Sequence, residues 1–380
     1  MRRRILLGII VLLPLILLFA LWRIARPIVH MVAKAGSETA WMDLGDEGKP
    51  DKFEPYLEKH PEDEARRMAA MVWYSRRHED PKRLKYHTLL MIKYHPSNDH
   101  IYYENSSAFF AGPAYRSEVI GSLEKQLERS HSEQELYWIL AMTCEQGAIP
   151  PVSTGDPATR TRFLRYYGLP QNTVLPTKID HALADKAIGY YKEAITVANG
   201  DRFYAPFYSR QLADLLLDLD RPKDAAEVCE RVVRQADEIS KPGLLVTYGQ
   251  ALKKMGDLNR ARNVLSQVRG CDKEEDGPGC HTTDAETLLG LIALQEHDVS
   301  AANRFLLSSC NVHKCCHNTT KGFSLRLAEK LLDAGQYDSV TQFCTIVLRD
   351  FTPGQPETQR LLDRAKSMRA KAKQSSPTPP

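Results

Sequence analysis

Residues 247–269 read TYGQALKKMGDLNRARNVLSQVR and contain two short apolar stripes around a central break. Apolar or small residues recur at helical spacing on each side of Gly256-Asp257, and a glycine at such a place ends a helix. The first stripe holds Gly249, Leu252 and Met255, and the second holds Ala261, Leu265 and Val268. The stretch therefore predicts a helical hairpin. Neither helix buries its stripe alone, so the hairpin needs neighbours.

The same pattern occurs four times in the C-terminal half of the chain. A large residue followed by a small one marks each first helix, at Leu212-Ala213, Tyr248-Gly249, Leu289-Gly290 and Leu327-Ala328. A small or β-branched residue follows twelve positions later, at Ala225, Ala261, Ala302 and Val340. We expect the breaks between helices at Asp220, Gly256, His297 and Gly335. Spacings of roughly 36, 41 and 38 residues predict a stack of repeated units rather than one closed core.

These residues resemble the tetratricopeptide repeat (TPR). That family places a large residue and then Gly or Ala in its first helix, a Gly or polar break seven residues on, and Ala in its second helix. The chain departs from the family because no Trp opens a unit, Cys or Leu replaces the second-helix aromatic, and the spacings exceed the usual 34 residues or so. The resemblance covers Arg202 to Phe351, and His281 to Phe351 also resembles the C-terminal part of a group of uncharacterised bacterial repeat proteins. It implies an all-α, TPR-like helical-hairpin solenoid that binds other proteins.

Weaker hairpins precede the four repeats. Pro61 to His78 and Pro81 to Tyr94 predict one hairpin, and residues 119–127 predict a further helix. Glu133 to Glu145 and Ile179 to Ala198 have the patterns of a first and a second helix. These helices predict that the stack extends back towards residue 60.

A proline-rich insertion at residues 147–178 separates the last two of these helices. A loop of that length inside a hairpin is either functional or disordered.

The predicted organisation is a basic flank at 1–4, a transmembrane signal anchor at 5–22, a linker at 23–60, degenerate hairpin repeats at 61–200 with the insertion at 147–178, four TPR-like repeats at 201–351, and a C-terminal helix end with a basic, Pro-rich disordered tail at 352–380.

An uncharged apolar run predicts a membrane anchor near the N-terminus. Residues 5–22 would form about 27 Å of helix, close to the thickness of the bilayer hydrocarbon core. Trp22 and Arg23 stand where interface anchors belong. The alternative is a cleaved signal peptide, but Ala33-Lys-Ala35, which has the residue types of a cleavage site, lies too far downstream. We expect an uncleaved single-pass helix that contacts the lipid bilayer through residues 5–22.

The orientation of this anchor follows from the charges beside it. Arg2, Arg3, Arg4 and the terminal amine precede the apolar run, whereas Arg23, Arg26 and Lys34 follow it. The positive-inside rule then favours a cytoplasmic N-terminus and extracytoplasmic repeats. For a chain of the bacterial type, the membrane would be the inner membrane.

The composition gives no electrostatic sign of nucleic-acid binding. The chain holds 51 Lys plus Arg against 48 Asp plus Glu, a net charge of +3, so we expect no nucleic-acid partner. The tail is locally basic, with Arg364, Lys366, Arg369, Lys371 and Lys373. It either contacts an acidic partner or anionic lipid, or serves as a solubilising extension.

The eight cysteines fall into two groups. Cys144, Cys229 and Cys344 lie in apolar stripes, where a thiol acts as a small hydrophobic group. The other five lie in or beside inserted loops: Cys271, Cys280, Cys310, Cys315 and Cys316. These are candidate disulfide cysteines in an oxidising compartment. The alternatives are a metal or redox site, for which the paired Cys-x2-Cys spacing is missing, and free surface thiols.

The usual catalytic motifs are absent from the sequence. It has no phosphate-binding Gly-x-x-x-x-Gly-Lys loop, no dinucleotide-binding Gly-x-Gly-x-x-Gly after a strand, no His-Glu-x-x-His and no Gly-x-Ser-x-Gly. We therefore expect a protein that is not an enzyme and needs no cofactor or metal. The alternatives are an accessory subunit of an enzyme, or an enzyme whose site lies in the 147–178 insertion.

Partner binding is the favoured function. In the resembling family, ligands contact the inner face of the first helices. The matching positions are Arg210, Asp214, Gln250, Lys253, Lys254, Leu291, Leu294, Glu329 and Leu332. The leucines indicate a partly apolar groove for a helix or hydrophobic segment, or else they pack against the next repeat. The chain is thus predicted to be a membrane-anchored scaffold for protein partners of unknown identity.

Overall fold

The computed structural model describes residues 50–77, 80–98, 101, 113–130, 133–149, 178–268, 279–310, 325–350 and 356–375. The predicted anchor at 5–22 and most of the 147–178 insertion lie outside these ranges. Within them, no helix combines the length and the apolar character needed to cross a bilayer. Every regular element of the described ranges is an α-helix, so the all-α prediction is confirmed.

The chain divides into two compact units, Met1–Ala187 (unit 1) and Ile188–Pro380 (unit 2). Unit 1 contains α2 (Pro50–Lys59), α3 (Glu64–Arg77), α4 (Pro81–Tyr94), α6 (Pro113–Leu127) and α7 (Gln134–Ala148). Helices α3 and α4 pack as the predicted hairpin, and α6 packs against both α4 and α7. Helix α9 (His181–Val197) crosses the boundary between the units.

Helix α2 lies inside the segment that the sequence assigned to a linker. Phe53, Tyr56 and Leu57 stand at helical spacing, but the stripe is short and Pro50 and Pro55 argue locally against a helix. Leu57 is nevertheless buried, and α2 packs against α3. Burial of one large apolar side chain against a neighbour therefore outweighs the weak local preference.

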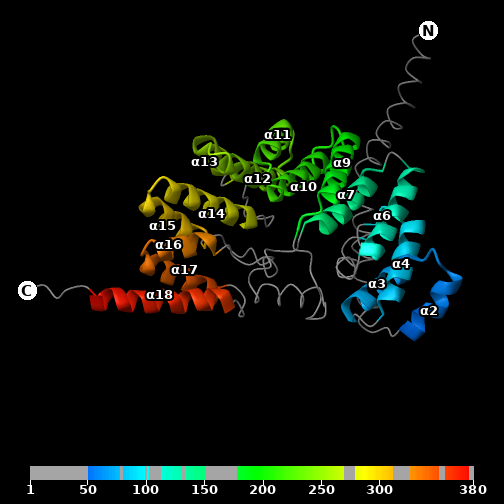
Figure 1. The fold of residues 1–380 in the computed structure, drawn as a ribbon, viewed down its shortest axis with the longest axis horizontal. Helices are drawn as coiled ribbons and strands as arrows, with labels where there is room; N and C mark the ends of the chain where they lie inside the picture. Colours follow the sequence, from blue (N-terminus) through cyan, green and yellow to red (C-terminus); the bar gives the residue numbers. More distant parts are fainter. Residues whose placement is uncertain are drawn as a thin grey trace, which may run out of the picture. The chain divides into compact units, whose positions relative to one another are not determined.

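Unit 2 contains the four repeats as helical hairpins (Figure 1). The helices are α10 (Tyr204–Asp218), α11 (Pro222–Val232), α12 (Lys241–Lys254), α13 (Leu258–Val268), α14 (Gly279–Gln295), α15 (Val299–Ser308), α16 (Arg326–Asp333), α17 (Tyr337–Asp350) and α18 (Pro356–Ser375). The pairs α10–α11, α12–α13, α14–α15 and α16–α17 are the hairpins, and α18 packs against α17. The prediction of stacked TPR-like hairpins is confirmed.

Each hairpin turns at the predicted residue. Asp220, Gly256, His297 and Gly335 have left-handed φ angles of 56°, 85°, 63° and 78°. At the second turn, the Gly256 N–H donates to the Lys253 carbonyl at 3.1 Å and the Asp257 N–H donates to the Leu252 carbonyl at 3.0 Å. The other three turns repeat this pair of bonds, which is the Schellman motif that satisfies the last carbonyls of a helix. The same backbone conformation therefore ends the first helix of each of the four repeats.

The small residues of the pattern are sites of close helix packing. A Cβ built on Gly249 would lie 2.5 Å from Leu265 Cγ, on the partner helix of the same hairpin. A Cβ on Gly290 would overlap Leu327 of the next first helix. Both leucines are buried, so the missing side chains let neighbouring helices approach and fill the space between them.

The cysteines of the apolar stripes lie in the core, as predicted. Cys144, Cys229 and Cys344 are fully buried. Burial raises the pKa of Cys144 to about 12 and that of Cys344 to about 11. These thiols therefore stay protonated near neutral pH and act as small hydrophobic groups.

Candidate functional site

The first helices α10, α12, α14 and α16 pack side by side in unit 2, each against the next. We call the surface that they expose the first-helix face. The nine predicted partner-binding residues all lie on these four helices. Their burial and their contacts divide them into distinct groups.

Arg210 and Asp214 form a polar site between α10 and α12. They lie one turn apart, with Arg210 Nε 3.9 Å from Asp214 Oδ2, and Thr247 Oγ1 of α12 donates to Asp214 Oδ1 at 2.9 Å. A Cβ on Gly243 would lie 3.1 Å from Arg210 Cδ and 3.0 Å from His281 Cε1. The glycine thus leaves room for Arg210 and His281 to lie over α12. No pattern in the sequence indicates that His281 belongs to this site.

A cluster of cations lies further along the first-helix face. Lys253 of α12 is half-buried, and Arg326 and Lys330 are exposed on α16. Burial lowers the pKa of Lys253, and the charges of Arg326 and Lys330 lower it further. Among the described residues, no carboxylate forms an ion pair with any of the three. Only Lys253 was predicted, because the two α16 cations become its neighbours through the stacking of repeats.

Lys254 has a structural contact of its own. Its Nζ donates to the Leu217 carbonyl at 2.8 Å and lies 3.5 Å from Asp220 Oδ1. It therefore ties α12 to the C-terminal end of α10. Gln250 is half-buried and Glu329 is exposed, so both remain accessible from solvent.

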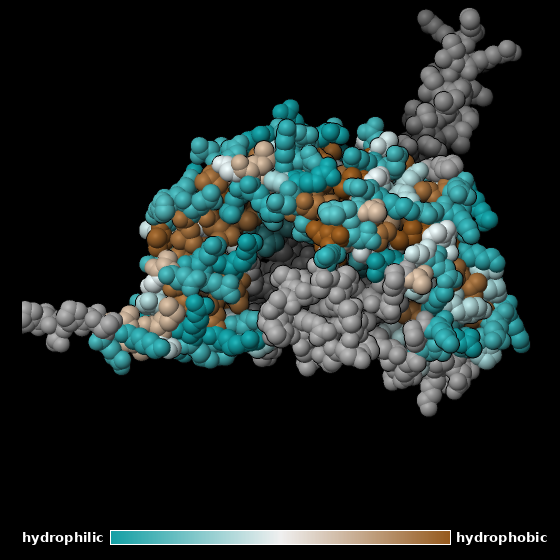
Figure 2. All heavy atoms as spheres, in the orientation of Figure 1, coloured by the Kyte–Doolittle hydropathy of each residue, from teal (hydrophilic) through white to brown (hydrophobic). Residues whose placement is uncertain are grey.

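The three predicted groove leucines differ in burial. Leu332 is fully buried and Leu291 is 7% exposed, and both belong to the hydrophobic core built by α14 to α18. Leu294 is partly buried against the same core. Figure 2 shows hydrophobic residues gathered over α14 and α15, with hydrophilic residues around them. The predicted apolar groove is therefore largely filled by core packing, and the accessible members of the nine predicted residues are polar or charged.

The loop cysteines are only partly described. Cys310 is buried at the end of α15, with its sulfur 4.0 Å from the Leu306 carbonyl oxygen. Cys271, Cys315 and Cys316, and the side chain of Cys280, lie outside the described part of the chain, so the disulfide assignment stays a prediction. Within the described part, no three His, Cys, Asp or Glu side chains are grouped as a metal site would require.

A pocket of about 490 Å³ opens between α9, α10 and α11 of unit 2. Its apolar lining comes from Ile188, Ile195, Leu212, Leu216, Val228 and Val232, and its polar lining comes from Lys192, Thr196, Ser209, Arg221, Asp224, Glu227 and Arg231. Ser209 is fully buried, and its hydroxyl has no hydrogen-bond partner among the described residues. The sequence did not single out this pocket, because no periodic pattern marks a position where one side chain is too small.

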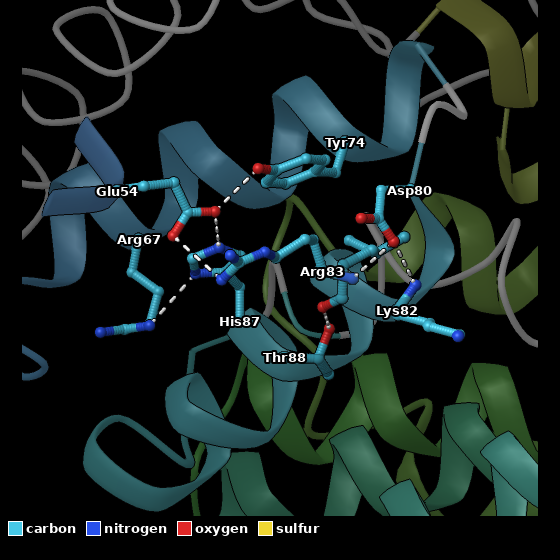
Figure 3. A network of polar contacts seen from close by, with 9 residues as sticks. Glu54, Arg67, Tyr74, Asp80, Lys82, Arg83, His87 and Thr88 are labelled. Carbon is cyan, nitrogen blue, oxygen red and sulfur yellow. Dashed lines mark hydrogen bonds and ion pairs between the residues drawn. The ribbon is translucent and has the colours of Figure 1, made fainter. Parts of the chain in front are cut away.

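Unit 1 contains a buried polar network that links α2 to the α3–α4 hairpin (Figure 3). Glu54 Oε1 accepts hydrogen bonds from Tyr74 OH at 2.7 Å and from His87 Nε2 at 3.0 Å. Arg83 Nη1 lies 3.6 Å from Glu54 Oε2. Arg67 Nη1 lies 3.2 Å from His87 Nδ1, and both of these side chains are fully buried.

The partners of His87 define its protonation state. Arginine can only donate, so His87 Nδ1 must accept from Arg67, and its proton must sit on Nε2, which faces Glu54. Burial lowers the pKa of His87, and Arg67 and Arg83 lower it further, although Glu54 opposes this effect. Burial alone would raise the pKa of Glu54, but the hydrogen bonds from His87 and Tyr74 hold it below its ordinary value. The network is therefore a neutral imidazole between a guanidinium and a carboxylate.

Stacked antiparallel hairpins, with left-handed residues at every turn and small residues at every close approach, define a TPR-like helical repeat protein. Solved structures with a similar arrangement include BtubC (BKLC) from P. vanneervenii, at 15% identity over 70% of this chain and 93% of that chain, with a TM-score of 0.40. YrrB, a TPR protein with an unusual peptide-binding site, matches at 15% identity over 66% of this chain and 97% of its own, with a TM-score of 0.35. The Cut9-Hcn1 hetero-tetramer of APC/C matches at 12% identity over 84% and 59%, with a TM-score of 0.35. No protein-family model and no curated protein matches the chain.

Proposed function

We propose that this protein is a scaffold that binds an acidic segment of a partner protein on the first-helix face of unit 2. The observation that carries the proposal is the cluster of Lys253, Arg326 and Lys330, which has no carboxylate partner among the described residues. The charges of Arg326 and Lys330 act unfavourably on the Lys253 ammonium, and an anionic partner would offset that repulsion.

Other residues of the first-helix face are within reach of the same partner. Arg210 and His281 lie over α12 at Gly243, where Arg210 is paired with Asp214. Gln250 is accessible and lies one turn before Lys253 on α12. An extended or helical acidic segment can therefore contact several first helices at once, as partners of solenoids do.

Photo-crosslinking in the cell tests this proposal. A photoreactive residue at Gln250 of the full-length protein should capture one reproducible partner, crosslinked through a segment rich in Asp or Glu. Reversing three charges, Lys253→Glu, Arg326→Glu and Lys330→Glu, should reduce capture at least tenfold. The matched control reverses exposed cations of second helices, Lys223→Glu and Arg304→Glu, and should leave capture unchanged. Equal capture by both variants would refute the acidic-segment proposal.

We further propose that the scaffold acts at a membrane, anchored by residues 5–22, with its repeats outside the cytoplasm. The uncharged run flanked by basic residues supports this proposal. Protease treatment of intact spheroplasts should then remove unit 2 and leave a short membrane-bound fragment. Release of the intact protein from the membrane by high salt would contradict the proposed anchor. Full protection of the repeats from protease would contradict the proposed orientation.

A further inference from the structure

The pocket between α9, α10 and α11 lies beside a buried position at which the repeats differ. Ser209 stands four residues before Ala213, and Leu245 stands four residues before the equivalent Gly249. Leu245 is buried and fills its place in the second repeat. A serine in the same place supplies less volume, and it buries a hydroxyl that has no partner among the described residues. The Ser209 oxygen is inaccessible to solvent, so this serine shapes the floor of the pocket and does not contact what enters it.

A second position that differs between the repeats also lines this pocket. The residue after the left-handed turn is Asp257 in the second repeat and Asp298 in the third, and Asp298 caps its helix by accepting from the Ala301 N–H at 2.8 Å. The first repeat has Arg221 there, which makes no side-chain cap. Arg221 instead lines the pocket and donates from Nε to Asp224 Oδ2 at 2.7 Å. A position that holds Asp in two other repeats therefore contributes a cation to the pocket wall.

The residues that line the pocket indicate the kind of ligand that it would bind. Six aliphatic side chains line the pocket, and Ile195 and Val228 are the more accessible of them. Three cations line the pocket against two carboxylates, and Arg221 is already paired with Asp224. Lys192 of α9 and Arg231 of α11 have no ion-pair partner among the described residues. The lining therefore has an excess of positive charge, with one of these two cations on α9 and the other on α11.

We propose that this pocket binds a small amphipathic carboxylate, with its aliphatic body against the accessible side chains of Ile195 and Val228 and its carboxylate between Lys192 and Arg231. A volume of about 490 Å³ lies in the range of small-molecule sites. This inference goes beyond the scaffold function. Ser209, Leu212 and Leu216 lie roughly 150° around the axis of α10 from Arg210 and Asp214, so the pocket and the partner surface are separate.

Isothermal titration of the full-length protein in lipid nanodiscs tests the pocket. Hexanoate should bind saturably at one site per chain. Acetate lacks the aliphatic body and hexylamine carries the opposite charge, so both should bind at least tenfold more weakly. Ser209→Leu, which installs the residue of the second repeat, should weaken hexanoate at least tenfold. Because every variant shares the same nanodisc, partitioning into lipid is subtracted directly.

Arg231→Gln provides a second variant that does not touch the core, since Arg231 is exposed. It should weaken hexanoate about fivefold or more while circular dichroism stays unchanged. Absence of saturable hexanoate binding, equal affinity of hexylamine, or unchanged affinity in both variants would overturn the proposal. Binding of an aliphatic peptide without binding of hexanoate would overturn it as well.

Discussion

At the scale of single residues, an absent side chain lets the two helices of the second repeat pack, since a Cβ on Gly249 would lie 2.5 Å from Leu265 Cγ. We expect Gly249→Val to lower the free energy of unfolding by about 1–3 kcal/mol, as overpacking of a filled core does. Urea denaturation followed by circular dichroism measures this loss. Gly189 is the matched control, because nothing lies within 4 Å of its Cβ position. Equal losses in Gly249→Val and Gly189→Val would contradict the packing argument.

The turn residues give a second prediction at this scale. His297 has a φ of 63°, where an L side chain crowds the backbone, and Gly256 has a φ of 85°, where glycine does not. His297→Gly should therefore raise the free energy of unfolding by about 0.5–1 kcal/mol, and Gly256→Ala should lower it by about 1 kcal/mol. Thermal melting of both variants checks the two opposite signs. If the melting temperatures of both variants shifted in the same direction, the φ angle would not be what decides the stability of these turns.

At the scale of elements, the polar network holds α2 to the α3–α4 hairpin only while His87 is neutral. The pKa of His87 is lowered in the fold, so protonation favours the unfolded state. Its stabilisation is present above its ordinary pKa near 6.5 and is lost as the pH falls below that value. A proton on His87 Nδ1 would also face Arg67 Nη1 across 3.2 Å. Acidification should therefore release α2.

Hydrogen exchange of the α2 amides measures that release. Protection, corrected for intrinsic exchange, should fall between pH 7 and pH 5.5 while the α6–α7 pair keeps its protection. His87→Gln is the control, because a neutral amide can accept from Arg67 and donate to Glu54 at either pH. The pKa of Glu54 is lowered from 4.5, so that carboxyl stays ionised across this window. Equal pH dependence in the wild type and in His87→Gln would refute the role of the imidazole.

The sequence analysis predicted those helices and turns that depend on short-range, periodic patterns of residues. The four breaks and the small residues before them recur at fixed places, and the structure has a left-handed turn at each break. Helix α2 escaped prediction because it is held by contacts between residues far apart in the chain, such as Glu54 with His87, 33 positions away. The pocket at Ser209 escaped for a different reason, since a single small side chain changes no pattern. Periodicity predicts stacking well, and it says little about long-range polar contacts.

At the scale of the whole molecule, unit 2 ends in a helix that covers the last repeat. Leu361, Leu362 and Ala365 of α18 are buried, and α18 packs along α17 (Figure 1). The face that they cover belongs to a core that includes Phe343 and Val347. A terminal helix of this kind closes the hydrophobic stack, as capping elements do in other solenoids.

Removal of this cap tests whether unit 2 is stabilised by nearest neighbours. Deletion of residues 356–380 should strip hydrogen-exchange protection from α16 and α17, because their apolar face loses its cover. Helices α10 to α13 should keep most of their protection, since each repeat of a solenoid contacts only its neighbours. Deletion of residues 376–380 alone is the control and should change neither region. A uniform loss of protection across α10 to α17 would instead mean that unit 2 unfolds as one cooperative core, and the repeat pattern would then describe its geometry but not its energetics.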